Sequence, residues 1–144
     1  MKTEVKTNKI LHYLVWECDG DLFAAQTHEC REVELNARLI RVPYADSHVR
    51  GIVSLRGEMV TVLEVRELLG KNVPSDVQYS GVIRLRMDGA DVAIAATSVH
   101  DIVKVTESER QELPPSFNET ERKYLSGVIP AAGGVARILR LETL

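Results

Sequence analysis

The residues that could bind a metal or support catalysis are few and widely spaced. His28 and Cys30 form a His-x-Cys pair, and on a β-strand this spacing would place both side chains on one face as two metal ligands. The remaining histidines follow no spacing that would complete the four ligands of a structural metal site. A small-molecule or metal-dependent enzyme that uses His28, Cys30, His100 and Glu64 is therefore kept as an alternative function. The sequence does not favour it, and we predict no catalytic residue, cofactor or metal ion.

Glu64 is the charged residue that most needs an explanation, because it lies within the apolar run 59–65. Strand alternation would place it on the same face as Val60 and Val62, where an unpaired buried carboxylate is costly. An ion pair with Arg66 or Arg56 would offset that cost, and so would a solvated position at a sheet edge. The pattern favours a structural role for Glu64 over a catalytic one.

The composition is that of an ordinary globular protein, with 44% hydrophobic residues, 27% charged residues and a net charge of -3. This charge gives no reason to expect nucleic acid binding. No apolar run approaches the roughly 20 residues that cross a bilayer, and the N-terminal residues lack a signal-peptide pattern. We therefore predict a cytoplasmic protein with no direct membrane insertion. In that reducing compartment Cys18 and Cys30 are expected to be free thiols.

The elements that must position these residues are predicted to be short β-strands. Apolar, β-branched runs alternate with turn-forming residues throughout the chain, a pattern typical of a barrel-type all-β fold with little helix. Short helical turns are predicted at 66–70 and 106–111, and the longest segment without strand character is 107–123. The predicted hairpins are 10–18 with 22–25, 52–55 with 59–65, 82–87 with 92–96, and 128–129 with 135–141.

The chain contains the same pattern twice. Residues 49–68 align without a gap on residues 125–144 at an offset of 76, and an upstream segment repeats at an offset of 69 that places Asp19 on Asp88 and Ala24 on Ala93. Two such units predict a duplicated small barrel or sheet. We expect a tail over residues 1–9, a first repeat over about 10–76 and a second over about 77–144. Each half is close to the lower size limit for independent stability, so the halves are expected to support each other.

One stretch resembles a known family. The segment V-R-G-I-V-S-L-R-G at 49–57, followed by the apolar run that leads to Leu68-Leu69-Gly70, is similar to the bacterial chemotaxis coupling protein CheW family. That family carries G-[IV]-x-N-L-R-G-x-[IV] and then a strand ending in D-L-R-x-x-L-G. Ser54 stands where the family commonly has Asn, and Glu64-Val65-Arg66 stands for Asp-Leu-Arg. Further similarities at 30–33, 124–128 and 138–144 extend the resemblance over about residues 10–144.

The resemblance implies two SH3-like five-stranded barrels packed round a shared apolar region. It also implies a non-enzymatic adaptor in chemotaxis signal transduction. Its partners would be the cytoplasmic tip of a methyl-accepting chemoreceptor and the regulatory domain of the histidine kinase CheA, in arrays at the inner face of the membrane. By position in the family motifs, Cys30 and Glu32 would contribute to receptor contact and Arg56 to coupling.

Two further expectations follow from this resemblance. The apolar junction between the barrels would be the groove for a receptor helix tip, and simultaneous binding of receptor and kinase would link their conformations.

The chain also departs from the family pattern. Thr97 replaces a common Asp, Ala93 replaces a common Gly, and Arg137 and Arg140 make the final strand more basic than usual. A CheW-like scaffold in a signalling pathway outside chemotaxis is therefore a second alternative.

Overall fold

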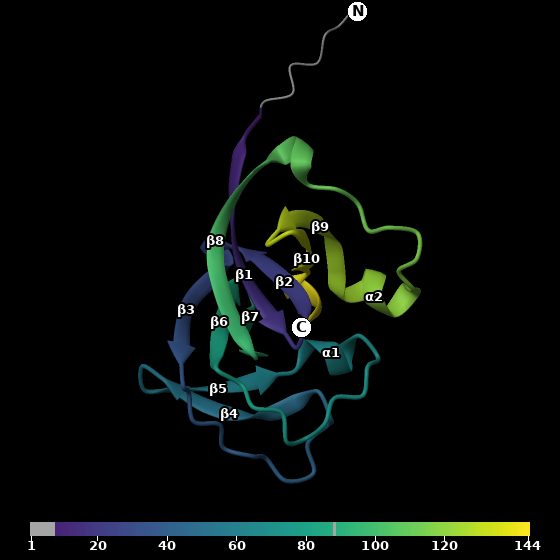
Figure 1. Cartoon of the computed structure of the whole chain (residues 1–144). Helices are drawn as coiled ribbons and strands as arrows, with labels where there is room; N and C mark the ends of the chain where they lie inside the picture. The colour runs from purple at the N-terminus through teal and green to yellow at the C-terminus, as the bar shows by residue number, and fades with distance from the viewer. Residues whose placement is uncertain (1–7, 88) are drawn as a thin grey trace, which may run out of the picture.

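The computed structural model describes residues 8–87 and 89–144, which form two five-stranded sheets (Figure 1). The strands are β1 (Ile10–Cys18), β2 (Asp21–Gln26), β3 (Cys30–Leu35), β4 (Val49–Leu55), β5 (Glu58–Leu63), β6 (Gly81–Met87), β7 (Ala90–Ala96), β8 (Ser98–Thr106), β9 (Leu125–Ala131) and β10 (Gly134–Leu139). The prediction of an all-β fold with two five-stranded barrels is confirmed. All four predicted hairpins are present, as β1–β2, β4–β5, β6–β7 and β9–β10. Most of the predicted tail, and Asp88 in the predicted turn, lie outside the described residues.

The two repeats exchange strands. Sheet A has the order β8-β1-β2-β10-β9, and sheet B has the order β3-β6-β7-β5-β4. The first two strands of the first repeat therefore join the last three of the second repeat, and the reverse holds for the other sheet. Each sheet is built from both halves of the sequence, so neither sequence half contains a complete sheet.

The register of the exchanged strands matches the sequence repeat. In sheet A the parallel pair β2–β10 aligns Ala24 with Ile138, and in sheet B the parallel pair β7–β5 aligns Ala93 with Val62. Ala24 and Ala93 are equivalent at the offset of 69, and Val62 and Ile138 are equivalent at the offset of 76. The two sheets are thus related by the internal duplication down to individual residue pairs.

A central hydrophobic core fills the space between the sheets. It includes Trp16 and Phe23 from sheet A, whose rings lie 6.3 Å apart, and Leu85 and Ile94 from sheet B, all of them fully buried. Each sheet also encloses a smaller core of its own, around Tyr13 in sheet A and around Val62 in sheet B. We expected the junction to be an open groove for a helix, and this expectation is wrong for its interior, because the protein's own side chains fill it.

Two equivalent glycines allow the outer strands β4 and β9 to be covered. Backbone bridges pair Ile40 with Ile52 beside β4, and Gln111 with Val128 beside β9. A Cβ atom on Gly51 would lie 2.5 Å from the carbonyl oxygen of Ile40, and one on Gly127 would lie 2.6 Å from that of Gln111. Since real Cβ atoms do not approach a carbonyl oxygen this closely, both positions require glycine.

The helices are short. Helix α1 (Val65–Leu68) follows β5 and is capped by the Glu64 side chain, close to the helical turn predicted at 66–70. The helix predicted at 106–111 is a single 3-10 turn (Glu107–Glu109), and the predicted loop after it contains α2 (Glu119–Tyr124). Within residues 8–87 and 89–144, no helix has the length and apolar character needed to span a membrane.

We predict that Gly127→Ala lowers the free energy of unfolding by about 2 kcal/mol, because the added methyl group must displace a backbone segment. Gly134→Ala, in the neighbouring hairpin strand, is the control, since its Cβ would lie 4.0 Å from the nearest carbonyl oxygen. Urea denaturation of both variants measures the difference. Equal stability of the two variants would contradict the close approach of the backbone at Gln111 to β9.

The strand exchange predicts that fragments 1–76 and 77–144 do not fold alone but fold when mixed. In the first fragment β3 and β5 lack the two strands that lie between them in sheet B, so their edges and the central core stay exposed. Circular dichroism and urea titration of each fragment and of the equimolar mixture test this. Cooperative unfolding of either fragment by itself would contradict the exchange.

Candidate functional site

Two of the three predicted site residues, Glu32 and Arg56, meet in one charged cluster. Glu32 lies on β3 and accepts a hydrogen bond from Arg56 Nε at 3.1 Å. Its other carboxylate oxygen accepts one from Arg84 Nη1, also at 3.1 Å. Arg84 on β6 donates as well to both carboxylate oxygens of Asp91 at 2.9 and 2.8 Å, and its Nη2 lies 3.2 Å from Glu58. We call these five residues the Arg84 cluster.

Arg84 is the buried centre of this cluster, with a side chain only 1% exposed. A buried cation is tolerated only when it is paired and hydrogen-bonded, and three carboxylates meet that requirement here. The Asp91 hydrogen bonds, followed by those of Glu32, raise the pKa of the guanidinium. In return the Arg84 hydrogen bonds hold the pKa of Asp91 below its ordinary value. The cluster therefore locks β3, β6 and β7 to the tip of the β4–β5 hairpin.

Arg56 is the exposed member of the cluster. It occupies the first position of the two-residue turn between β4 and β5, with φ of 49°, and Gly57 follows with φ of 79°. Positive φ at both positions is typical of the turns that join antiparallel hairpins. The side chain is 78% exposed, although its Nε is bound to Glu32. Arg56 thus presents a cation to solvent from a fixed position.

Cys30, the third predicted site residue, lies apart from the charged cluster. It begins β3 and is half-buried against the central core. Its thiol donates weakly to the carbonyl oxygen of Gln26 at 3.5 Å. Burial, with a smaller effect from Glu29, raises the pKa of Cys30 to about 12. The thiol is therefore protonated at neutral pH and a poor nucleophile. Both cysteines are free, as predicted.

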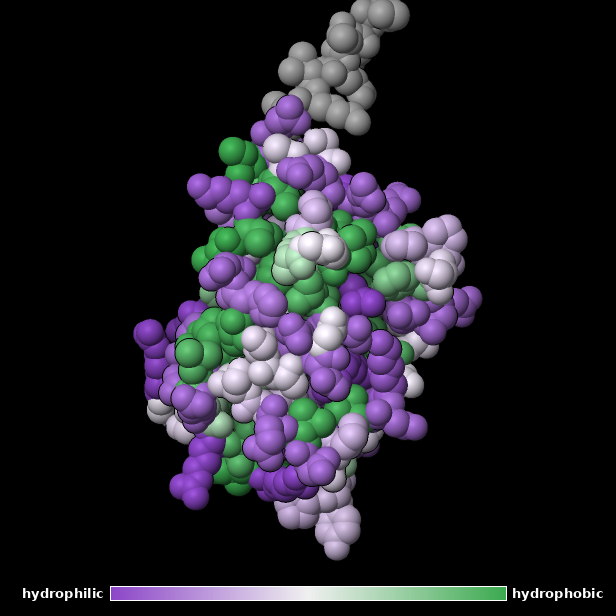
Figure 2. Space-filling view, in the orientation of Figure 1, coloured by the Kyte–Doolittle hydropathy of each residue, from purple (hydrophilic) through white to green (hydrophobic). Residues whose placement is uncertain are grey.

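Exposed apolar side chains lie at the edge of the filled junction. Val33 and Leu35 on β3 are 40% and 61% exposed, and Ile102 on β8 is 58% exposed. Leu35 and Val99 both border Gly81, at 3.1 and 3.5 Å from the position of a Cβ atom there, so β3 and β8 come together at this edge. Figure 2 shows hydrophobic side chains over this region among polar neighbours. We call Val33, Leu35, Val99 and Ile102 the seam surface.

Glu64 has the structural role that the sequence favoured. The carboxylate is fully buried and accepts hydrogen bonds from Arg66 Nε at 3.0 Å and from the Tyr79 hydroxyl at 2.5 Å. Burial, followed by the hydrogen bond with Glu64, raises the pKa of Tyr79. Of the two partners considered, Arg66 forms the ion pair, while Arg56 belongs to the Arg84 cluster.

The residues of the alternative metal or enzyme site are not brought together. His28 is exposed in a 3-10 turn (Thr27–Glu29), so it does not share a strand face with Cys30. His100 on β8 lies 3.1 Å from Glu17 on β1, and Glu64 is bound to Arg66. Across the two described ranges, no group of three or more histidine, cysteine, aspartate or glutamate side chains is arranged to hold a metal ion.

Arg137 on β10 and Arg140, which directly follows this strand, are both bound within the molecule. The Arg137 guanidinium lies 5.9 Å from the ring centre of Phe23 and 5.7 Å from that of Phe117, and its Nη1 is 3.7 Å from Asp21. Arg140 Nε donates to the carbonyl oxygen of Leu125 at 3.1 Å. The Arg137 contacts attach the segment before α2 to sheet A, and Arg140 is bound to the start of β9. Both basic side chains therefore have structural roles.

Sequence reasoning missed Arg84 and the seam surface. Arg84 had the same signal as Glu64, because it is a charged residue within an apolar strand sequence, Val82-Ile83-Arg84-Leu85. Asp91 is seven residues away on the next strand, but Glu32 and Glu58 are distant in the sequence, so the sequence marked an unusual residue and did not reveal its partners. Val33 and Ile102 are equivalent at the offset of 69. A sequence comparison alone does not show that both are exposed.

The fold and sequence match proteins of one family. A family model described as a CheW-like domain matches residues 12–144. The chain belongs to the CheW-like family. It is 22% identical over 103 residues to the chemotaxis protein CheW of Rhizobium meliloti (strain 1021), covering 72% of this chain and 66% of that protein. It is 23% identical over 114 residues to the chemotaxis protein CheW of Bacillus subtilis (strain 168), covering 79% and 72%.

A solved structure has the same fold. The crystal structure of the scaffolding protein TtCheW from Thermoanaerobacter tengcongensis matches with a TM-score of 0.77 at 17% identity, covering 92% of this chain and 90% of that one. The chain spans just under two thirds of the Rhizobium relative. The protein of the solved structure is described as a scaffolding protein.

The lowered pKa of Asp91 predicts a specific acid sensitivity. A carboxylate whose pKa is lower in the folded state stabilises the protein above its ordinary pKa of 3.8, and this stabilisation is lost as pH falls through the lowered value. We expect Asp91→Asn to lower stability at neutral pH by about 1 kcal/mol. We also expect a shallower loss of stability than in wild type below about pH 4. Urea titrations from neutral to acidic pH measure both effects.

Asp101→Asn, at an exposed position on β8, is the matched control and should follow the wild-type pH dependence. If Asp91→Asn also shows the wild-type pH dependence, the ion pair with Arg84 does not contribute to stability as described.

Proposed function

We propose that this chain is an adaptor that couples chemoreceptors to the histidine kinase CheA in chemotaxis signalling. The proposal rests above all on the CheW-like match over residues 12–144. The two relatives, both named chemotaxis protein CheW, support a role in chemotaxis. In this function the chain works at the inner face of the membrane, where it is held by receptor arrays.

The receptor tip is proposed to bind the seam surface. A receptor tip is helical, and a helix binds a partner by laying its apolar side chains on a hydrophobic surface. Val33, Leu35 and Ile102 offer such side chains at the edge of the junction, and half-buried Cys30 lies at the start of the same strand β3. This keeps the predicted receptor role of Cys30 but moves the docking position from the filled interior to its edge.

The kinase regulatory domain is proposed to bind the tip of the β4–β5 hairpin. Arg56 is exposed there, and Met59 beside it is a 61% exposed apolar residue. A charged residue next to an apolar one is a common composition for a protein interface. Glu32 connects the two surfaces, because it lies on β3 with Val33 and binds Arg56 across the Arg84 cluster. Coupling then means that binding at one surface changes the free energy of binding at the other.

We predict that Ile102→Glu weakens binding of the receptor tip by about tenfold or more and leaves binding of the kinase regulatory domain unchanged, because it places a charge in an apolar contact. Arg56→Ala is expected to show the opposite pattern. Both side chains are exposed, so both variants should fold. Biolayer interferometry with each purified partner measures the affinities.

Glu119→Gln, on the exposed start of α2, serves as the control and should bind both partners normally. Glu32→Lys is a less clean test, because it also removes a partner from buried Arg84. If Ile102→Glu and Arg56→Ala bind both partners like wild type, the proposed surfaces are wrong. If wild-type protein binds neither partner, the adaptor function is wrong, and a CheW-like scaffold role outside chemotaxis takes its place.

A further inference from the structure

The sulfur atoms of this chain differ in their access to solvent. Cys18 is fully buried and Cys30 is half-buried, whereas the Met59 side chain is 61% exposed. Among the cysteine and methionine side chains that the structure describes, Met59 is the only exposed one. An oxidant dissolved in water therefore reaches this thioether more readily than it reaches either thiol.

Ionisation separates the thiols from the thioether further. A thiol reacts as its thiolate, and burial raises the pKa of both cysteines, that of Cys30 to about 12. At neutral pH roughly one Cys30 side chain in 100,000 is then a thiolate. A thioether has no proton to lose, so its sulfur lone pair is available at any pH near neutral. Oxidation is thus directed away from the cysteines and towards Met59.

Met59 lies on the outer face of the β4–β5 hairpin. It pairs with Ser54 on β4 and follows the turn that contains Arg56. The next residue, Val60, is buried in the core of sheet B, so strand alternation directs the thioether away from that core. A change in the polarity of Met59 therefore alters the surface of the hairpin and leaves the core of the sheet intact.

We propose that Met59 is a modification site, at which a hydroperoxide oxidises the thioether to the sulfoxide and thereby weakens binding of the kinase regulatory domain. This inference rests on the proposed adaptor function and adds redox control to it. In the reaction the sulfur lone pair attacks the hydroxyl oxygen of the peroxide and forms an S–O bond while the O–O bond breaks. The sulfur loses two electrons and the peroxide gains them. The leaving oxygen takes the proton of the transferred hydroxyl group and departs as water or an alcohol.

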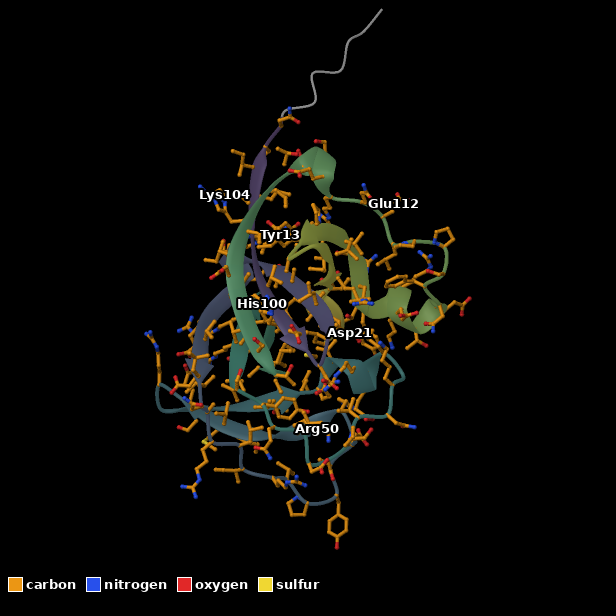
Figure 3. The ribbon with its side chains drawn as sticks, in the orientation of Figure 1. Tyr13, Asp21, Arg50, His100, Lys104 and Glu112 are labelled. Atoms are coloured by element: carbon orange, nitrogen blue, oxygen red, sulfur yellow. The ribbon has the colours of Figure 1, made fainter. Side chains whose placement is uncertain are left out.

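The sulfoxide changes the polarity of the hairpin surface. Its oxygen is a hydrogen-bond acceptor, and burying an acceptor in an apolar contact without a donor is unfavourable. We therefore expect kinase binding to weaken by about tenfold. Receptor binding should stay the same, because the seam surface lies on β3 and β8. Figure 3 shows His100 and Lys104 along β8, above the β4–β5 hairpin in this view.

The first measurement follows the chemistry in the full chain without a partner. The protein is treated with hydrogen peroxide at neutral pH, together with N-acetylmethionine amide as a fully exposed reference. Peptide mass spectrometry then follows each methionine and cysteine. We expect Met59 to gain one oxygen atom at a rate within about fivefold of the reference, while Cys18 and Cys30 stay unmodified.

The second measurement is biolayer interferometry with the kinase regulatory domain and, separately, with the receptor tip. Oxidised wild-type protein should bind the kinase domain about tenfold more weakly than untreated protein, and methionine sulfoxide reductase should restore the affinity. Met59→Leu has no thioether at this position, so treatment should leave its affinity unchanged. Met87→Leu, which lacks another methionine of the chain, should lose affinity on treatment as wild type does. The ratio before and after treatment is compared within each protein, so neither variant needs to bind like wild type.

Three results would overturn the inference. Met59 stays unmodified while the reference is consumed, or wild type binds the kinase domain equally well once Met59 is fully oxidised, or Met59→Leu loses as much affinity on treatment as wild type. If untreated wild-type protein does not bind the kinase domain, the adaptor function fails, and its redox control fails with it. Kinase binding that is present before treatment and unchanged after it overturns the redox control alone.

Discussion

The parallel pairing of β2 with β10 and of β7 with β5 is the constraint on which the rest of the structure depends. These two short contacts join strands from opposite repeats. They join the two parts of each sheet and also place Phe23, Ile94 and Leu139 in the same central core. Burial of apolar surface is the largest favourable contribution to folding. Because this core is shared, the two sheets cannot separate without exposing it to water. The molecule is therefore a rigid body with surfaces at fixed relative positions.

A rigid body suits an adaptor that transmits small changes between partners. The Arg84 cluster extends this rigidity to the exposed β4–β5 hairpin, since a buried guanidinium with three carboxylate partners resists displacement. Glu32 binds both the buried Arg84 and the exposed Arg56. A partner that binds and displaces Arg56 would therefore also act on β3, the strand that carries part of the seam surface. In the proposed receptor arrays, modest binding energies at each surface would suffice, because tethering raises the effective concentration of each partner.

The sequence predicted more of the fold than of the site, for physical reasons. The hairpins were predictable because apolar alternation and turn residues are local signals. The repeat offsets also identified equivalent positions such as Ala24 and Ala93. They could not show that the repeats exchange strands, since pairing within one copy or between copies would use the same residues. Glu64 was interpreted correctly because its partner Arg66 is two residues away. The environment of Arg84 was not predictable, because its carboxylates come from three other strands.

The account makes the chain a bridge that holds two partners at once, so the most direct measurement is the composition of the complex in solution. Analytical ultracentrifugation of the chain with an excess of both the receptor tip and the kinase regulatory domain can determine it. The account predicts one species that contains all three proteins, because the seam surface and the hairpin tip are separate regions. If each partner instead displaces the other, so that only binary complexes form, the two proposed surfaces overlap and the bridging function is contradicted.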